Sequence, residues 1–162
     1  MSGSPQTVDS AAGRRASLAA AAMIGVGVMA AVDEIVFHQI LAWHHFYDRS
    51  SSAVGLLSDG LLHAASLVLL VGGFFWLADL HRRGVTTRRS AWAGFVLGLG
   101  GFQLFDGTVN HKLLDLHQIR YGVDVLPYDL AWNTAAVLLL LLGTVLAFRS
   151  RREAVPVPER RR

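Results

Sequence analysis

The sequence predicts an all-α integral membrane protein: a bundle of four transmembrane helices made from two copies of one helical hairpin. Three observations predict this fold. The 162-residue chain is 52% hydrophobic and only 17% charged, which is too apolar for a soluble domain of this size. It contains four long apolar segments, and a polar motif in the first of these recurs in the third.

The fourth apolar segment is the clearest membrane span. It is 19 residues long with Asn133 and Thr134 as its only marked polar interruptions, long enough to cross a bilayer core of about 30 Å. The first and third segments qualify only if Asp and His residues are accepted within a span. The predicted spans are Ala16–His45, Leu61–Leu80, Ala91–Gln118 and Leu130–Phe148.

The recurring motif aligns without gaps at a spacing of 73 residues, Gly25–His45 on Gly98–Gln118. Because so many rare residues coincide, we interpret the chain as a tandem duplication. The identical pairs include Gly25/Gly98, Gly27/Gly100, Asp33/Asp106, His38/His111, Leu41/Leu114 and His44/His117.

The duplication extends over a whole hairpin, because a spacing of 70 aligns Asp59 with Asp129. We expect repeat 1 over residues 16–80 and repeat 2 over 91–149. Two spans per repeat keep both copies in the same orientation, related by a pseudo-twofold axis along the membrane normal. The glycines of the motif would let the first and third helices approach closely. Residues 1–15 and 150–162 are predicted to be a disordered N-terminus and a basic tail.

Basic residues predict the orientation. Twelve of the fifteen Lys and Arg residues lie in the N-terminal segment, the loop at 81–89 and the C-terminal tail. By the positive-inside rule these parts are cytoplasmic, so we expect a multi-pass membrane protein with both termini inside. The basic pI then reflects orientation and not a nucleic-acid partner. Arg14 and Arg15 before an apolar run also resemble a signal peptide, but the pattern recurs internally, so a retained span is expected.

Polar residues of the first copy lie on one side of a helix. At 100° per residue Asp33, Glu34, His38, His44 and His45 share an arc of about 140°. Ionisable residues in membrane spans usually face an interior cavity and mark function. The helical rise would spread them over three levels and about 16 Å, with Asp and His of the second hairpin helix at the upper level.

We interpret this stripe as a transition-metal site. Imidazole and carboxylate ligands suit Zn, Fe, Mn or Cu(II). The absence of cysteine excludes thiolate sites. The predicted metal ligands are His38, His111, His44, His117, His63 and His45. The carboxylates expected to orient them are Asp33, Asp106, Asp59 and Glu34.

Other interpretations stay open. The site could belong to a membrane-embedded metal-dependent hydrolase or oxidoreductase. His38 and His111 could instead be the axial ligands of a b-type haem, which would leave the other polar residues unexplained. In a purely structural scaffold, His44 and His45 would snorkel to the interface and the Asp residues would form interhelical hydrogen bonds. Asp59 and Asp129 also suit helix N-caps.

The motifs resemble an uncharacterised bacterial four-span membrane family, a domain of unknown function. Its signature reads about DGxxxHQxLxWHH and DGxxH, matched here by DEIVFHQILAWHH at 33–45, DGLLH at 59–63 and a second copy from Asp106 to His117. The resemblance covers about residues 22–148 and implies the four-span fold. Glu34 stands where the family tends to have Gly and Gln118 where it tends to have His, which puts in doubt a site of four upper-level histidines.

The resemblance also implies partners. Some members of that family are associated with membrane factors for copper loading of respiratory oxidases. It therefore implies a metal-handling or respiratory-oxidase assembly accessory, with the oxidase or its copper-assembly factors as partners besides the lipid bilayer. A bundle this small can also form a homodimer.

Overall fold

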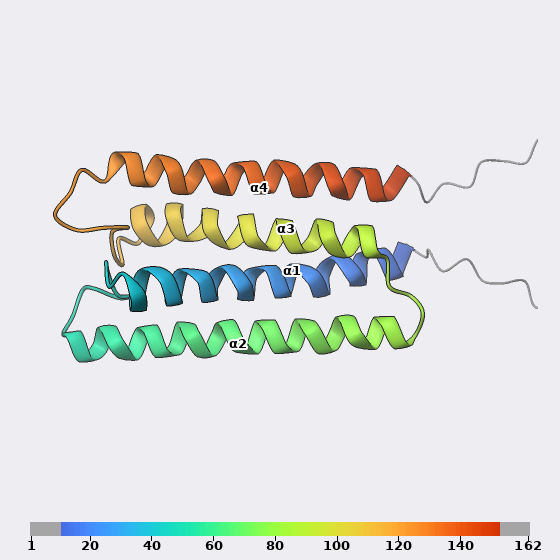
Figure 1. The fold of residues 1–162 in the computed structure, drawn as a ribbon, viewed down its shortest axis with the longest axis horizontal. Helices are drawn as coiled ribbons and strands as arrows, with labels where there is room; N and C mark the ends of the chain where they lie inside the picture. The colour runs from blue at the N-terminus through green and yellow to red at the C-terminus, as the bar shows by residue number, and fades with distance from the viewer. Residues whose placement is uncertain (1–10, 153–162) are drawn as a thin grey trace, which may run out of the picture.

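The computed structural model describes residues 11–152, and this part of the chain is helical without strands. The elements in order are α1 (Ala11–Asp33), η1 (Glu34–Ile40), α2 (Ser52–Arg82), α3 (Arg88–Phe105), η2 (Asp106–Leu113) and α4 (Leu126–Arg152). The four long helices lie side by side, with α1 and α3 in the middle and α2 and α4 outside (Figure 1). The wider π-helical segments η1 and η2 continue α1 and α3.

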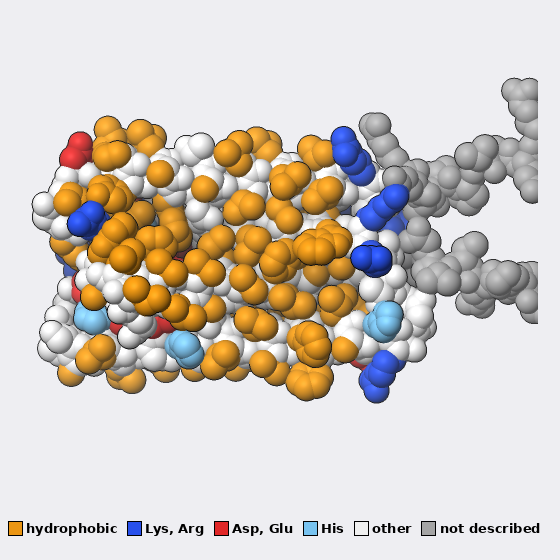
Figure 2. Space-filling model, in the orientation of Figure 1, with side chains coloured by type: hydrophobic (Ala, Val, Ile, Leu, Met, Phe, Trp, Pro, Cys, Tyr) orange, Lys and Arg blue, Asp and Glu red, His pale blue; other side chains and the backbone are white. Residues whose placement is uncertain are grey.

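Three stretches are long and apolar enough to cross a membrane: Ala11–Ile40, Ser52–Arg82 and Leu126–Arg151, with mean hydropathy of 1.9 to 2.0. α3 is not among them, because the two arginines at its start lower the mean hydropathy of its 18 residues. It packs between α1 and α4, so neighbouring helices cover much of its surface. Figure 2 shows apolar side chains over the middle of the bundle and most Lys and Arg of this face near the end where the termini leave.

The helices extend beyond their predicted limits toward this basic end. Residues 11–15 and 150–152, predicted as parts of the tails, are helical, since alanine and arginine are good helix formers. The predicted disorder of residues 1–10 and 153–162 lies outside the described residues. At the opposite end of the bundle, α2 starts at Ser52, nine residues before the predicted Leu61.

Glycines bring α1 and α3 to backbone contact. A Cβ on Gly25 would overlap the backbone of α3, and one on Gly98 would overlap the backbone of α1. Gly27 and Gly100 face α2 and α4 instead, where a Cβ would lie 2.8 and 2.9 Å from the nearest backbone atom. Only half of the predicted glycine set therefore forms the α1–α3 crossing, and the other half packs each central helix against its outer neighbour.

The central helices end earlier than predicted. η1 stops at Ile40 and η2 at Leu113, before the predicted ends at His45 and Gln118. Ala42 and Asp115 then take left-handed backbone conformations, with φ of 48° and 49°. This conformation is uncommon for residues other than glycine, and here it ends the helical path so that the loops at 41–51 and 114–125 can close over the end of the bundle.

Candidate metal centre

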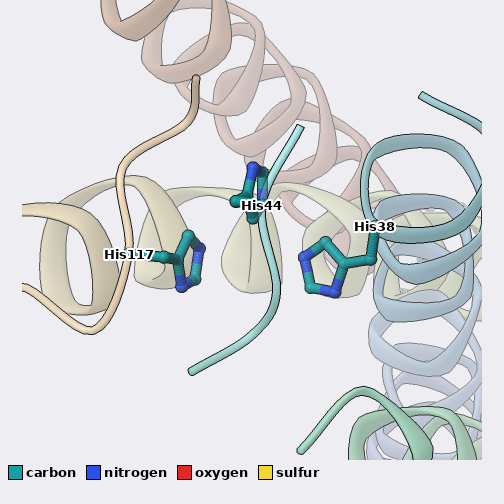
Figure 3. Close-up of side chains that lie close together, drawn as sticks. All are labelled: His38, His44 and His117. Atoms are coloured by element: carbon teal, nitrogen blue, oxygen red, sulfur yellow. The ribbon is translucent and has the colours of Figure 1, made fainter. Parts of the chain in front are cut away.

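Four buried histidine rings gather where η1, η2 and the two loops meet. His38 comes from η1 and His111 from η2, while His44 and His117 come from the loops that follow. Each residue is at most 6% exposed. Centroids of neighbouring rings lie 4.5 to 6.2 Å apart, and Figure 3 shows the rings of three of them close together. We call these four residues the histidine cluster.

The cluster corrects the predicted arrangement in levels. A continuous helix would place His44 more than one turn above His38. The rings are instead 4.6 Å apart, centroid to centroid, because the helix ends at Ile40 and the loop returns His44 to the level of His38. His117 returns in the same way to His111, at 4.7 Å.

The two loop histidines are anchored by each other's loops. His44 Nδ1 donates to the carbonyl of Ile119 at 2.9 Å, and His117 Nδ1 donates to the carbonyl of Phe46 at 2.8 Å. A carbonyl oxygen only accepts, so Nδ1 must carry the proton in both rings and Nε2 must carry the lone pair. A backbone hydrogen bond from Asp48 to the Leu116 carbonyl joins the loops as well.

His38 is oriented by carboxylates. Its Nδ1 lies 2.9 Å from Glu34 Oε2 and 3.3 Å from Asp59 Oδ1. The Nε2 atoms of His38, His44 and His117 are buried without a hydrogen-bond partner among the described residues. One ligand atom from each of these three residues lies within 4.8 Å of the others. Buried polar atoms left unpaired cost about 1–3 kcal/mol each, so the three Nε2 atoms are candidate ligands for a metal ion.

The fourth ring, His111, has a looser environment. Its Nε2 lies 3.1 Å from Asp106 Oδ2, and neither of its ring nitrogens has a hydrogen-bond partner in the described part of the chain. Asp106, His111 and His117 form a second group whose ligand atoms lie within 4.8 Å of one another. Asp129 Oδ1 lies 4.0 Å from His111 Nδ1, while the other oxygen of Asp129 pairs with Lys112 Nζ at 2.5 Å.

Four buried carboxylates surround the cluster, each at most 2% exposed. Within residues 11–152, the basic groups that lie within 4.0 Å of their oxygens are all histidine ring nitrogens. Several buried carboxylates in one place need protons or a cation. The four are Asp33, Glu34, Asp59 and Asp106.

The remaining predicted ligands lie outside the cluster. His45 is half-buried and donates from Nδ1 to Asp59 Oδ2 at 2.6 Å, while the Phe46 amide donates to the other oxygen at 2.7 Å. His63 is exposed on α2 and belongs to none of the groups that could hold an ion. Its predicted role therefore lacks geometric support.

The prediction that Asp59 and Asp129 cap helices is wrong. α2 begins at Ser52 and α4 at Leu126, so both Asp residues lie inside their helices. Asp59 instead orients His38 and His45.

Burial keeps the loop histidines neutral. It lowers the pKa of His44 to about 2, helped by the nearby His117. It lowers the pKa of His117 to about 4, an effect that Asp106 partly opposes. Both rings are therefore neutral at pH 7, the form in which imidazole binds a metal.

A cavity of about 700 Å³ lies beside the cluster. His44 lines it, as do His45 and Asp48. An ion pair between Arg49 and Asp115, which also line the cavity, ties the two loops together. His44 thus connects the buried cluster with an open space at this end.

Comparison with known families shows to which protein family the chain belongs. A family described as "Predicted membrane protein (DUF2243)" matches residues 20–150. The chain belongs to this family. The matched region contains the whole histidine cluster and confirms the resemblance to a membrane family of unknown function. No curated protein and no solved structure matches the chain.

The sequence does not reveal the backbone carbonyls that hold the two loop histidines in place. The carbonyls of Ile119 and Phe46 belong to backbone groups that every residue has, so no residue pattern marks them. Their role follows only from the way the two loops meet.

Proposed function

We propose that this DUF2243 protein holds a transition-metal ion in the histidine cluster. One observation carries the proposal: the Nε2 atoms of His38, His44 and His117 are buried without a hydrogen-bond partner among residues 11–152, while Nδ1 of each ring faces a fixed acceptor. Hydrogen bonds at the second nitrogen are the usual way in which proteins orient metal-binding histidines. A purely structural cluster would have no reason to leave three imidazoles unsatisfied.

The ligand set follows from these distances. His38, His44 and His117 are the primary ligands, and His111 with Asp106 completes the shell from the other side. Glu34 and Asp59 orient His38. Three or four imidazoles with a carboxylate suit Zn, Cu(II) or Fe.

We propose further that all four helices span a bacterial cytoplasmic membrane, with the termini inside and the cluster near the outer face. The basic end seen in Figure 2 supports this orientation. A tandem duplication is supported by features repeated at the spacing of 73: the helix ends at Ile40 and Leu113 and the left-handed residues Ala42 and Asp115. The close glycine contacts of α1 and α3 follow the same spacing.

The biological role we propose is metal handling, as an accessory in respiratory-oxidase assembly. The cavity beside His44 supports reversible exchange, because it leads from the outer end to a ligand without opening the bundle. Copper-assembly factors of the oxidase are the proposed partners.

A metal-dependent hydrolase or oxidoreductase is the second candidate. One observation favours it: a cavity of about 700 Å³ is larger than an ion needs and lies within the size range of small-molecule sites. A b-type haem between His38 and His111 fits less well, because two further histidines and Asp106 occupy the space around these rings.

Metal content tests the proposal. Detergent-purified protein, supplied with Cu, Zn, Fe and Mn, is analysed by elemental mass spectrometry and absorption spectroscopy. We expect about one metal ion per chain, its loss in a His38→Ala/His111→Ala variant, and its retention in His63→Ala, which changes an exposed histidine. A wild-type protein without metal would overturn the proposal, and a Soret band would establish haem instead.

A further inference from the structure

A second binding feature lies at the opposite, basic end of the bundle. A groove of about 330 Å³ runs between α1, α2 and α3. Its wall is almost wholly apolar, with polar residues only at the α2–α3 loop. The apolar lining consists of Ala21, Ile24, Leu77, Ala91, Trp92 and Phe95.

Two polar groups that have no hydrogen-bond or ion-pair partner among residues 11–152 lie where the groove meets the loop. Thr86 Oγ1 is buried and has no hydrogen-bond partner in the described part of the chain. Arg88 is exposed, and the ion pairs within residues 11–152 do not include it, whereas Arg82 and Arg83 both pair with Asp79. The groove therefore combines an apolar channel with a cation and a hydroxyl at one end, neither of which has a partner in the described part of the chain.

We propose that this groove binds an anionic phospholipid, with one acyl chain along the apolar wall and the phosphate at Arg88 and Thr86. This inference is independent of the metal site. The phosphate would accept from the guanidinium and from the Thr86 hydroxyl, so both unpaired groups gain a partner. Basic pockets beside membrane helices are suited to such headgroups.

The dimensions favour a lipid over a protein partner. Phe95 lies seven residues after Arg88 on α3, so the groove extends about 10 Å from the headgroup position toward the bilayer centre. A partner helix with its side chains is about 10 Å wide, which is too wide for a channel of this volume. An acyl chain is narrow and lies in the same direction as the helices.

The fluorescence of Trp92 can report lipid binding directly, because Trp92 lines the groove and is 59% exposed. The full-length protein with Trp43→Phe, Trp76→Phe and Trp132→Phe is placed in vesicles of phosphatidylcholine containing brominated phosphatidylglycerol or brominated phosphatidylcholine. We expect the anionic lipid to quench Trp92 at about fivefold lower mole fraction, the effect of one arginine near the headgroups. Arg88→Gln should abolish this preference, while Arg82→Gln, whose arginine pairs with Asp79, should retain it.

Native mass spectrometry gives a readout with all tryptophans in place. Wild-type protein and Arg82→Gln should retain phosphatidylglycerol in preference to phosphatidylcholine. Arg88→Gln should lose the preference, and Ala91→Leu, which fills the groove, should lower retention of both lipids. Equal quenching by the two lipids in the wild-type background, or equal retention in wild type and Arg88→Gln, would overturn the proposal.

Discussion

His44 and His117 stack ring on ring, with centroids 4.5 Å apart and planes 7° apart. Each ring is held by a backbone carbonyl of the other's loop. The stack therefore depends on both loops at once, and neither histidine is positioned by its own segment alone. Both halves of the chain are therefore needed to form the histidine cluster.

The first prediction concerns this reciprocity. His44→Gln removes a ligand and also the hydrogen bond that fixes the second loop, so metal affinity should fall at least about a hundredfold. His117→Gln should have the same effect. Competition with a chromophoric chelator measures the affinity. His63→Gln is the matched control and should leave it unchanged; a loss as large in the control would show that the geometry assigns the wrong histidines.

The second prediction concerns the weakly oriented His111. Lys112→Gln releases Asp129 from its ion pair, so that the carboxylate can accept from His111 Nδ1. Because orienting a ligand improves binding by about tenfold or more, metal affinity should rise. Lys112→Arg keeps the charge and should change little. Weaker binding in Lys112→Gln would contradict this account of His111.

The third prediction concerns Asp59. Asp59→Asn removes one acceptor of His38 and weakens the hydrogen bond from His45, so metal affinity should fall about 10–100-fold in the same chelator assay. Asp79→Asn is the control, since Asp79 pairs with arginines at the far end of the bundle. Equal affinities in the two variants would remove Asp59 from the site.

The fourth prediction is a pH dependence of the metal-free protein. The pKa of His44 is lowered to about 2 and that of His117 to about 4, against about 6.5 when unfolded. Between pH 6.5 and 4 the unfolded chain therefore binds protons that the folded chain does not. Stability should fall with decreasing pH, by up to about 1.4 kcal/mol per unit for each histidine.

Thermal unfolding in detergent between pH 4 and 8 measures this effect. His117→Gln should show a shallower decrease between pH 6.5 and 4 than the wild type. Identical slopes in the two proteins would show that His117 is not kept neutral by burial.

Much of the site could be predicted from the polar stripe. Asp33, His38 and their counterparts Asp106 and His111 are buried, because that stretch remains helical up to Ile40 and Leu113, although it is π-helical and not the α-helix of 100° per residue that the prediction assumes. The positions of the loop histidines could not be predicted in this way. Ala42 has a left-handed backbone conformation, and this turn could not be predicted because no glycine marks it in the sequence.

His63 shows the limit of short spacings. Its i,i+4 relation to Asp59 predicts a shared face, but the two differ in exposure because Asp59 points inward to His38 and His45. The all-helical class could be predicted better than the site, because it depends on composition. The predicted helix limits differ from the observed ones by up to nine residues. The third span is predicted only if Asp and His residues are accepted within it, and the composition of α3 alone does not identify α3 as a span.

X-ray absorption spectroscopy of the metal-loaded protein tests the central claim most directly. The account predicts a first shell with at least three imidazole nitrogens at about 2.0–2.1 Å, reduced by one in His44→Gln and unchanged in His63→Gln. A shell of oxygen ligands only, or one that the His44 substitution does not alter, would contradict a metal site in the histidine cluster.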